Sequence, residues 1–264
     1  NMNINLNKKL AIVTAGSKGI GFSVVESLLK SNAKVSFCSR KKTNIDNARL
    51  KLKKYEGNFF SLTGDIGDYK FLKKFVDKTK EHFNQNIEIL VNNNGGPPIG
   101  KTLEFSDNEW SNAFNVNFYS ALRMSKLVFN DMKKERWGRI INLTSLAAKE
   151  PPKGMILSNV TRAAVSSFSK TLSKEIAEFG ITVNTILTGG VFTERAENLI
   201  NLEIKKTGES FDDAVSRIES SIPVKKIATP EEFSKFIIFL ASDFSSYING
   251  VSIPIDGGSS VSIF

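Results

Sequence analysis

The chain is poor in the residues that build disulfides and metal centres. Among its 264 residues there is one cysteine, Cys38, and one histidine, His82. A single cysteine excludes an internal disulfide and is typical of a reducing compartment. His82 lies in a segment rich in Lys and Glu, as expected of a surface side chain, and no group of Cys, His and carboxylates has metal-ligand spacing. We therefore expect no metal site.

Long apolar runs are also missing. No stretch reaches the roughly 18 apolar residues of a membrane-spanning helix. The N-terminus lacks a basic segment followed by an apolar one, so a secretory signal is not expected. Together with the single cysteine, these absences favour a cytoplasmic protein with no membrane partner.

What the chain does have is positive charge, with a net value of +9. A basic chain can bind nucleic acid, or it can simply be rich in lysine and carry a site for phosphate groups. The lysines are spread over many segments, and no nucleic-acid-binding motif accompanies them. We therefore expect no nucleic-acid partner and favour a small-molecule substrate.

Apolar, strand-like runs alternate with helix-like segments along most of the chain. Runs rich in Val, Ile and Leu predict strands at 10–14, 34–38, 59–62, 87–91, 139–143, 181–186 and 251–255. Helices are expected between them at 19–31, 46–55, 69–83, 107–134, 155–179 and 230–242. Continuous apolar strands separated by helices indicate a parallel sheet covered on both faces. The predicted fold class is α/β, a single doubly wound Rossmann domain over residues 1–264 with a seven-stranded parallel sheet.

Residues 194–222 interrupt this alternation. They are polar, charged and helix-prone, and they lie between two predicted strands. In an open α/β sheet, an insertion at the carboxyl end of a strand lies over the ligand crevice. We interpret the segment as a lid over the substrate, and a surface helical hairpin with no role in binding is the alternative.

A glycine-rich turn joins the first predicted strand to the first predicted helix. Glycines permit a tight turn and let the backbone approach a pyrophosphate, which then lies at the N-terminus of the helix. In this position the turn predicts dinucleotide binding. Its candidate residues are Thr14, Gly16, Ser17, Lys18, Gly19, Ile20 and Gly21.

Basic residues at two places indicate which dinucleotide is bound. An acidic residue after the second strand would hold a ribose 2′-hydroxyl, but this chain has Ser39, Arg40 and Lys41 there, with Lys18 in the glycine-rich turn. Arg and Lys are suited to a 2′-phosphate. We expect NADP(H) rather than NAD(H). The alternative is that Arg40 and Lys41 are ordinary surface cations.

From about residue 8 to residue 258 the chain resembles the short-chain dehydrogenase/reductase family. Ala15 departs from its pattern by replacing the first glycine of the turn. The chain is most similar to 3-oxoacyl-carrier-protein-reductase-like members, in an atypical branch that lacks the catalytic Tyr. The matching residues, in order and at family spacing, are Thr14–Gly21, Asp65-Ile66, Asn92–Gly95, Asn117, Ser145, Thr188-Gly189, Val191, Thr193 and Asp256–Gly258.

The resemblance implies cofactor contacts beyond the turn, and a dimer or tetramer of identical subunits. Asp65 and Ile66 would flank the adenine. The cofactor would also be lined by the residues after the fourth and sixth strands, namely Asn92, Asn93, Gly95, Gly189, Val191 and Thr193.

The reaction site is where the chain departs most from the family. The family uses a Tyr to protonate the developing alkoxide and a Lys to lower its pKa and hold the nicotinamide ribose. Here these positions are Ser158 and Arg162, whereas Asn117 and Ser145 are retained. A serine is a much weaker acid than a phenol, whose pKa is about 10. Arg162 can still hold ribose hydroxyls, but a guanidinium is a poor proton relay.

Lys149 and Lys153 are candidate replacements, because they lie in the loop expected to border the substrate and a lysine can stabilise an oxyanion electrostatically. An exposed charged loop is the alternative. Three functions stay open. They are NADP(H)-dependent reduction of a carbonyl, with a 3-oxoacyl thioester as one possible substrate, conjugate reduction of an activated alkene, and a non-catalytic cofactor-binding protein.

Overall fold

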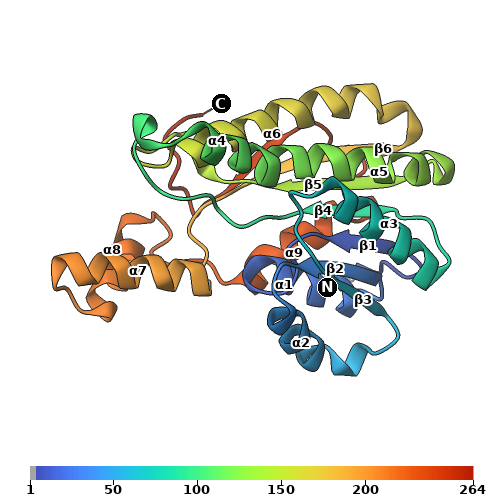
Figure 1. Ribbon diagram of the computed structural model, residues 1–264, viewed down its shortest axis with the longest axis horizontal. Coiled ribbons are helices and arrows are strands. Elements are labelled where there is room, and N and C mark those ends of the chain that lie inside the picture. Colours follow the sequence, from blue (N-terminus) through green and yellow to red (C-terminus); the bar gives the residue numbers. More distant parts are fainter. Residues whose placement is uncertain (1–3, 264) are drawn as a thin grey trace.

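The computed structural model describes residues 4–263, so residues 1–3 and 264 of the predicted domain lie outside it. Within that range, seven parallel strands form one sheet in the order β3-β2-β1-β4-β5-β6-β7, which confirms the predicted fold class (Figure 1). The order reverses between β1 and β4, where such sheets bind ligands. The strands are β1 (Leu10–Val13), β2 (Lys34–Ser39), β3 (Phe59–Thr63), β4 (Ile89–Asn92), β5 (Gly138–Leu143), β6 (Ile181–Thr188) and β7 (Ser252–Ile255).

Helices cover both faces of the sheet because successive side chains of each strand point to opposite faces. In β1, Ala11 and Val13 belong to one apolar cluster and Leu10 and Ile12 to the other. The first cluster lies under α1 (Gly19–Lys30), α2 (Lys42–Lys51) and α9 (Pro230–Leu240). The second lies under α3 (Tyr69–Phe83) and α5 (Ser120–Glu135), with α6 (Ile156–Glu175) beside α5 in Figure 1.

The predicted long helix 107–134 is interrupted. Its first part is α4 (Asp107–Phe114), whose N-terminus is held by reciprocal hydrogen bonds between Ser106 and Glu109. A π-helical turn, η3 (Asn115–Tyr119), then leads into α5. Such turns are rare and often accompany functional sites. The predicted helix 155–179 likewise ends early, because α6 stops at Glu175 and a short 3₁₀ turn follows.

Residues 194–222 form two helices that project from the sheet (Figure 1). These are α7 (Glu194–Thr207) and α8 (Phe211–Ser221), which we call the α7–α8 hairpin. Each starts with a hydroxyl cap, since Thr193 Oγ1 accepts from Ala196 N and Ser210 Oγ accepts from Asp213 N. In residues 4–263, no helix is both long and apolar enough to cross a bilayer.

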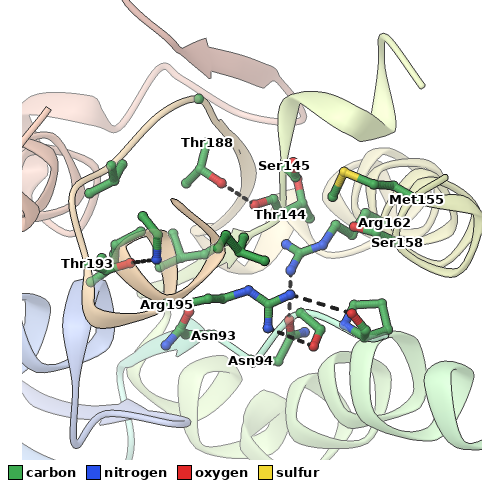
Figure 2. Close-up of a pocket in the computed structure, with 18 of the residues that line it drawn as sticks. Asn93, Asn94, Thr144, Ser145, Met155, Ser158, Arg162, Thr188, Thr193 and Arg195 are labelled. Carbon is green, nitrogen blue, oxygen red and sulfur yellow. Dashed lines mark hydrogen bonds between the residues drawn. The ribbon is translucent and has the colours of Figure 1, made fainter. Parts of the chain in front are cut away.

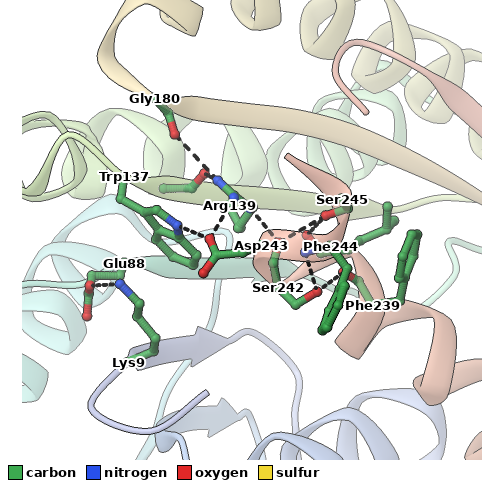
Figure 3. Close-up of polar contacts among 12 residues, drawn as sticks. Lys9, Glu88, Trp137, Arg139, Gly180, Phe239, Ser242, Asp243, Phe244 and Ser245 are labelled. Carbon is green, nitrogen blue, oxygen red and sulfur yellow. Dashed lines mark hydrogen bonds and ion pairs between the residues drawn. The ribbon is translucent and has the colours of Figure 1, made fainter. Parts of the chain in front are cut away.

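A group of polar contacts lies at the amino ends of the strands (Figure 3). Arg139, near the start of β5, is 3% exposed and stacks its guanidinium over Trp137 at 4.3 Å from the ring centroid. Its nitrogens donate to the carbonyl oxygens of Ser242 (3.1 Å), Gly138 (2.9 Å) and Gly180 (3.4 Å). Arg139 therefore links the starts of β5 and β6 to the segment that follows α9.

Candidate functional site

A cavity of about 300 Å³ opens at the carboxyl ends of β4, β5 and β6, on the edge of the sheet from which the α7–α8 hairpin projects (Figure 2). Segments far apart in sequence meet in it, as expected where a doubly wound sheet reverses its strand order. It is lined by Ile20, Asn93, Asn94, Gly96–Ile99, Leu143–Ser145, Met155, Ser158, Arg162, Thr188–Val191, Thr193, Arg195, Ala196 and Leu199.

The glycine-rich turn is held against the end of β4. Thr14 Oγ1 donates to Asn93 O at 2.7 Å and accepts from Asn93 N at 2.9 Å. Gly21 cannot carry a side chain here, because a Cβ would lie 2.4 Å from Ala15 O and 2.5 Å from Asn93 Nδ2. Among residues 4–263 no side chain caps the first turn of α1, and that turn contains no acidic residue. The free N–H groups of this turn can donate hydrogen bonds to an anion, and the helix dipole attracts its negative charge.

The basic residues predicted to bind a 2′-phosphate lie near the same turn. Ser39 is the last residue of β2, and Arg40 and Lys41 follow it directly, with both cations exposed. Lys18 is paired with the α7–α8 hairpin, because its Nζ lies 2.7 and 2.9 Å from the carboxylate oxygens of Glu194. The hydrogen bond and charge of Lys18, with the charge of Lys41, lower the pKa of Glu194. A carboxylate of this chain therefore lies among the cations expected to meet a phosphate.

Asp65 and Ile66 follow β3 and do not line the cavity. Asp65 Oδ1 accepts from Gly67 N at 2.8 Å, as in an ordinary side-chain turn, and Ile66 is buried. Asn92 is also tied into the structure, because its Nδ2 donates to Asn142 Oδ1 at 2.7 Å. Gly16, Ser17 and Gly95 lie outside the cavity lining, whereas Asn93, Gly189, Val191 and Thr193 are part of it.

Ser145, Ser158 and Arg162 meet at one side of the cavity (Figure 2). Ser145 follows β5 and its Oγ accepts from Ala147 N at 3.2 Å, which leaves the hydroxyl proton free to donate. Ser158 and Arg162 lie one turn apart on α6 and are 5% and 9% exposed. The spacing of four residues places both side chains on one face of the helix.

Arg162 has few partners for a buried cation. Its Nη2 lies 3.4 Å from Asn94 Oδ1, and its buried Nε has no hydrogen-bond partner in residues 4–263. Burial, reinforced by the charge of Arg195, lowers the pKa of the Arg162 guanidinium to about 10. It therefore remains cationic at neutral pH.

Asn117 lies in the π-helical turn η3 and borders a second, much smaller cavity. Asn92, Asn117 and Arg162 all line this cavity of about 10 Å³. Each of the three residues has a buried polar atom without a partner in the described chain. These atoms are Asn92 Oδ1, Asn117 Oδ1 and Arg162 Nε. The cavity is about large enough for one water molecule. Two acceptors and one donor beside it match the hydrogen bonds that such a water needs.

Neither Lys149 nor Lys153 lines the cavity. Lys149 Nζ donates to Ser262 O at 3.3 Å. The neighbouring Glu150 Oε1 accepts from Val261 N, Ser262 N and Ser262 Oγ at 2.8 Å each. This loop therefore holds the C-terminal segment, and its first lysine is directed to that segment.

Arg195 is a cavity residue that sequence reasoning missed. It lies in the first turn of α7, and its Nη1 donates to Gly96 O at 3.0 Å. The guanidinium packs directly on the backbone, since a Cβ on Gly96 would lie 2.3 Å from Arg195 Nη2. Burial lowers the pKa of Arg195. A cation in the first turn of a helix is unfavourable because of the helix dipole. This placement is the feature of the sequence that could have identified Arg195.

The arrangement fits a phosphorylated dinucleotide. The glycine-rich turn leads to the N-terminus of α1, which no described side chain caps. Lys18 lies in this turn, and Lys41 is close enough to Glu194, the ion-pair partner of Lys18, to lower the pKa of that carboxyl. Arg40 precedes Lys41 in the chain. At the inner end, hydroxyl groups and a guanidinium face a space large enough for a small substrate. In the described residues, no group of three His, Cys, Asp or Glu side chains could hold a metal ion.

Comparisons with known proteins agree with this geometry. Dehydrogenase/reductase SDR family member 4 of Caenorhabditis elegans is 36% identical over 252 residues, covering 95% of this chain and 94% of its own. The 3-oxoacyl-acyl-carrier-protein reductase FabG of Buchnera aphidicola is 32% identical over 257 residues, covering 97% and 98%.

Solved structures superpose over nearly the whole chain. L-sorbose reductase from Gluconobacter frateurii, complexed with NADPH and L-sorbose, has a TM-score of 0.94 at 27% identity and covers 99% of this chain and 100% of its own. A short chain oxidoreductase from Pseudomonas aeruginosa PAO1, described as containing an atypical catalytic center, has a TM-score of 0.89 at 27% identity and covers 98% and 99%. Residues 9–203 match the short chain dehydrogenase family, and with these relatives the match places the chain in that family of oxidoreductases.

Proposed function

We propose that the chain is an NADP(H)-dependent reductase of a carbonyl group, in a site where serine and arginine occupy the positions of the family's Tyr and Lys. The observation that carries the proposal is the meeting of Ser145, Ser158 and Arg162 in one cavity beside the glycine-rich turn. The turn supplies the place for a dinucleotide, and the three polar side chains supply groups that can bind a substrate oxygen.

NADP(H) is the cofactor that best suits this site. Lys18, Arg40 and Lys41 offer three cations near the outer end of the turn, which favours a 2′-phosphate over a free hydroxyl. The sorbose reductase neighbour was solved with NADPH, which supports the same choice. When bound, the reduced nicotinamide supplies the hydride.

The chain's own residues bind the substrate oxygen and stabilise the charge that forms on it. The hydroxyls of Ser145 and Ser158 donate hydrogen bonds to that oxygen, and the Arg162 cation lowers the energy of the negative charge. No Tyr, His, Lys or carboxyl side chain lines the described cavity. We propose that the proton comes from water held by Asn92, Asn117 and Arg162 in the adjoining small cavity.

Lys149 and Lys153 stay weaker candidates for stabilising the oxyanion. For Lys149 to reach the cavity, its Nζ must leave Ser262 O. The α7–α8 hairpin is proposed to act as the substrate lid, because the first two turns of α7 already contribute Arg195, Ala196 and Leu199 to the cavity.

Conjugate reduction of an activated alkene is a second candidate. It is favoured by the lack, in the described cavity lining, of a side chain that is acidic near neutral pH. In that reaction the hydride goes to carbon, and the enolate oxygen needs stabilisation by hydroxyl and guanidinium groups rather than immediate protonation.

The test is a turnover assay on the purified protein. NADPH oxidation is followed with 3-oxoacyl thioesters, aldehydes, diketones and enones, and NADPH binding is titrated on the same sample. We expect turnover to fall about 10²–10³-fold in Ser145→Ala, as for loss of an oxyanion donor, and to survive better in Ser158→Ala. Reduction of enones alone would identify the second candidate. NADPH binding with no turnover would contradict both and favour a non-catalytic protein.

A dimer or tetramer and a cytoplasmic location stay predictions. Tyr119 in η3 and Val160 on α6 are 41% and 38% exposed and lie on the layer of helices α4, α5 and α6. Burial of this layer against a second copy would explain their exposure. Light scattering on the purified protein measures the assembly, and a monomer would contradict it.

A further inference from the structure

The cavity contains two cations and, among its described lining residues, no carboxylate. Arg162 lies at its floor, on α6, and Arg195 lies at its rim, on α7. Figure 2 shows both guanidinium groups directed to the same part of the cavity, next to Asn94. Their charges interact strongly enough that Arg195 contributes to lowering the pKa of Arg162.

Both guanidinium groups have unused hydrogen-bonding capacity. A guanidinium offers five N–H donors. Arg162 donates one long bond to the neutral amide of Asn94, and its Nε is proposed to hold the water of the small cavity. Its remaining N–H groups make no hydrogen bond within residues 4–263. Arg195 donates to the backbone oxygens of Gly96 and Pro97 at 3.0 and 3.5 Å, which carry no charge. Arg162 is buried and Arg195 beside it is exposed, and a buried cation next to a like charge is costly without an anion. An anionic ligand would lower that cost and accept hydrogen bonds from the free N–H groups.

The cofactor is not the best candidate for that anion. Its 2′-phosphate has Lys18, Arg40 and Lys41, and its pyrophosphate has the uncapped N-terminus of α1. The two arginines instead lie on the side of Ser145 and Ser158, where the proposed reaction takes place. An anion there belongs to the substrate.

We propose that Arg162 and Arg195 form a carboxylate subsite and that the substrate is an oxo acid. This rests on the proposed reductase function and specifies its substrate class. A carboxylate matches the planar fork of a guanidinium and can accept from both residues. The remaining lining near the reaction centre includes Ile99, Met155 and Leu199, so the rest of the substrate is expected to be apolar.

The test compares an acid with its neutral ester. The probes are 2-oxo-4-phenylbutanoate and its ethyl ester, titrated calorimetrically into protein saturated with NADP⁺, which cannot deliver a hydride. We expect the acid to bind the wild-type protein about 10- to 100-fold more tightly than the ester, the factor of a charge-assisted hydrogen bond. Arg195→Gln should lower that ratio several-fold, because only Arg162 then remains to bind the carboxylate, and Arg195→Lys should lower it less.

Arg217→Gln is the matched control. It removes the same charge from the same hairpin, but Arg217 pairs with Glu203 and Glu209 outside the cavity, so the ratio should stay at its wild-type value. Equal binding of acid and ester, or no acid binding at millimolar concentration, would overturn the proposal. So would a loss of NADP⁺ affinity in Arg195→Gln with an unchanged ratio, because Arg195 would then serve the cofactor.

The subsite and the reductase can fail separately. Acid-selective binding to the NADP⁺ complex, without turnover of any oxo acid with NADPH, would leave the subsite standing and remove the reductase. Turnover of neutral ketones without preference for acids would support the reductase and remove the subsite.

Discussion

At the scale of single residues, the glycine-rich turn contains one non-glycine residue in a conformation that favours glycine. Ala15 has φ of 48°, in the left-handed region that costs an L-residue about 1–2 kcal/mol. Its carbonyl oxygen accepts from Asn93 Nδ2 at 3.1 Å, and this bond helps to hold the strained backbone. The family pattern has glycine here, so the sequence already contained the departure, although not its conformational consequence.

We therefore predict that Ala15→Gly stabilises the protein. The relief of strain exceeds the extra entropy of a glycine in the unfolded chain, and we expect a gain of about 1 kcal/mol, or about 2–4 °C in Tm. Thermal unfolding measures it. Asn84→Gly is the control, because Asn84 has a similar φ of 47° at the end of α3 but Asn tolerates this region well. A less stable Ala15→Gly protein would contradict the prediction.

At the scale of elements, sequence reasoning found what periodicity encodes and missed what depends on packing. Strand and helix order follow from apolar runs, and α3 has the predicted bounds 69–83. The π-helical turn around Asn117 is not predictable in this way, because one widened turn barely changes the spacing of apolar residues. In contrast, Ser145 could be assigned from the family pattern and its place after a predicted strand. Arg195 could not, because its contact with Gly96 joins two distant segments.

The α7–α8 hairpin also provides a prediction about cofactor affinity. Glu194, the first residue of α7, pairs with Lys18 at 2.7 Å, and both side chains are about half exposed. A 2′-phosphate at Lys18 must displace this carboxylate and would be repelled by it. Glu194→Gln removes the competition, so we expect NADPH to bind up to about 5-fold more tightly, because an exposed ion pair is weak.

NADH is the internal control for that variant. It lacks the 2′-phosphate, so its affinity for Glu194→Gln should equal its affinity for the wild-type protein. Fluorescence titration of both nucleotides at low ionic strength, where surface charges are least screened, measures the two effects. Equal gains for NADPH and NADH would show that Glu194 does not act through the 2′-phosphate and would contradict the prediction.

At the scale of the whole molecule, the two ends of the sheet have different tasks. The carboxyl ends carry the cavity, where buried polar atoms such as Arg162 Nε have no partner in the described residues. At the amino ends, Arg139 is instead satisfied by several carbonyl oxygens and a stacked indole (Figure 3). A buried guanidinium nitrogen without a partner beside a cavity indicates a place for a ligand, whereas a guanidinium with several partners stabilises the fold. The sequence suggested only the first end, because a lone Arg in an apolar strand has no motif.

We predict that Arg139→Met lowers the free energy of unfolding by about 2–4 kcal/mol, because it removes three hydrogen bonds of a buried guanidinium and its stacking on Trp137. Gly180 O and Ser242 O keep other donors, Gly138 N and Ser245 Oγ. The ion pair with Asp243 contributes little, since that side chain is 80% exposed, so Asp243→Asn should cost less than about 1 kcal/mol. Chemical denaturation of both variants measures the difference. NADPH affinity should be unchanged in each, because the site lies at the opposite ends of the strands. If Asp243→Asn were as destabilising as Arg139→Met, the ion pair rather than the carbonyl contacts would stabilise this edge.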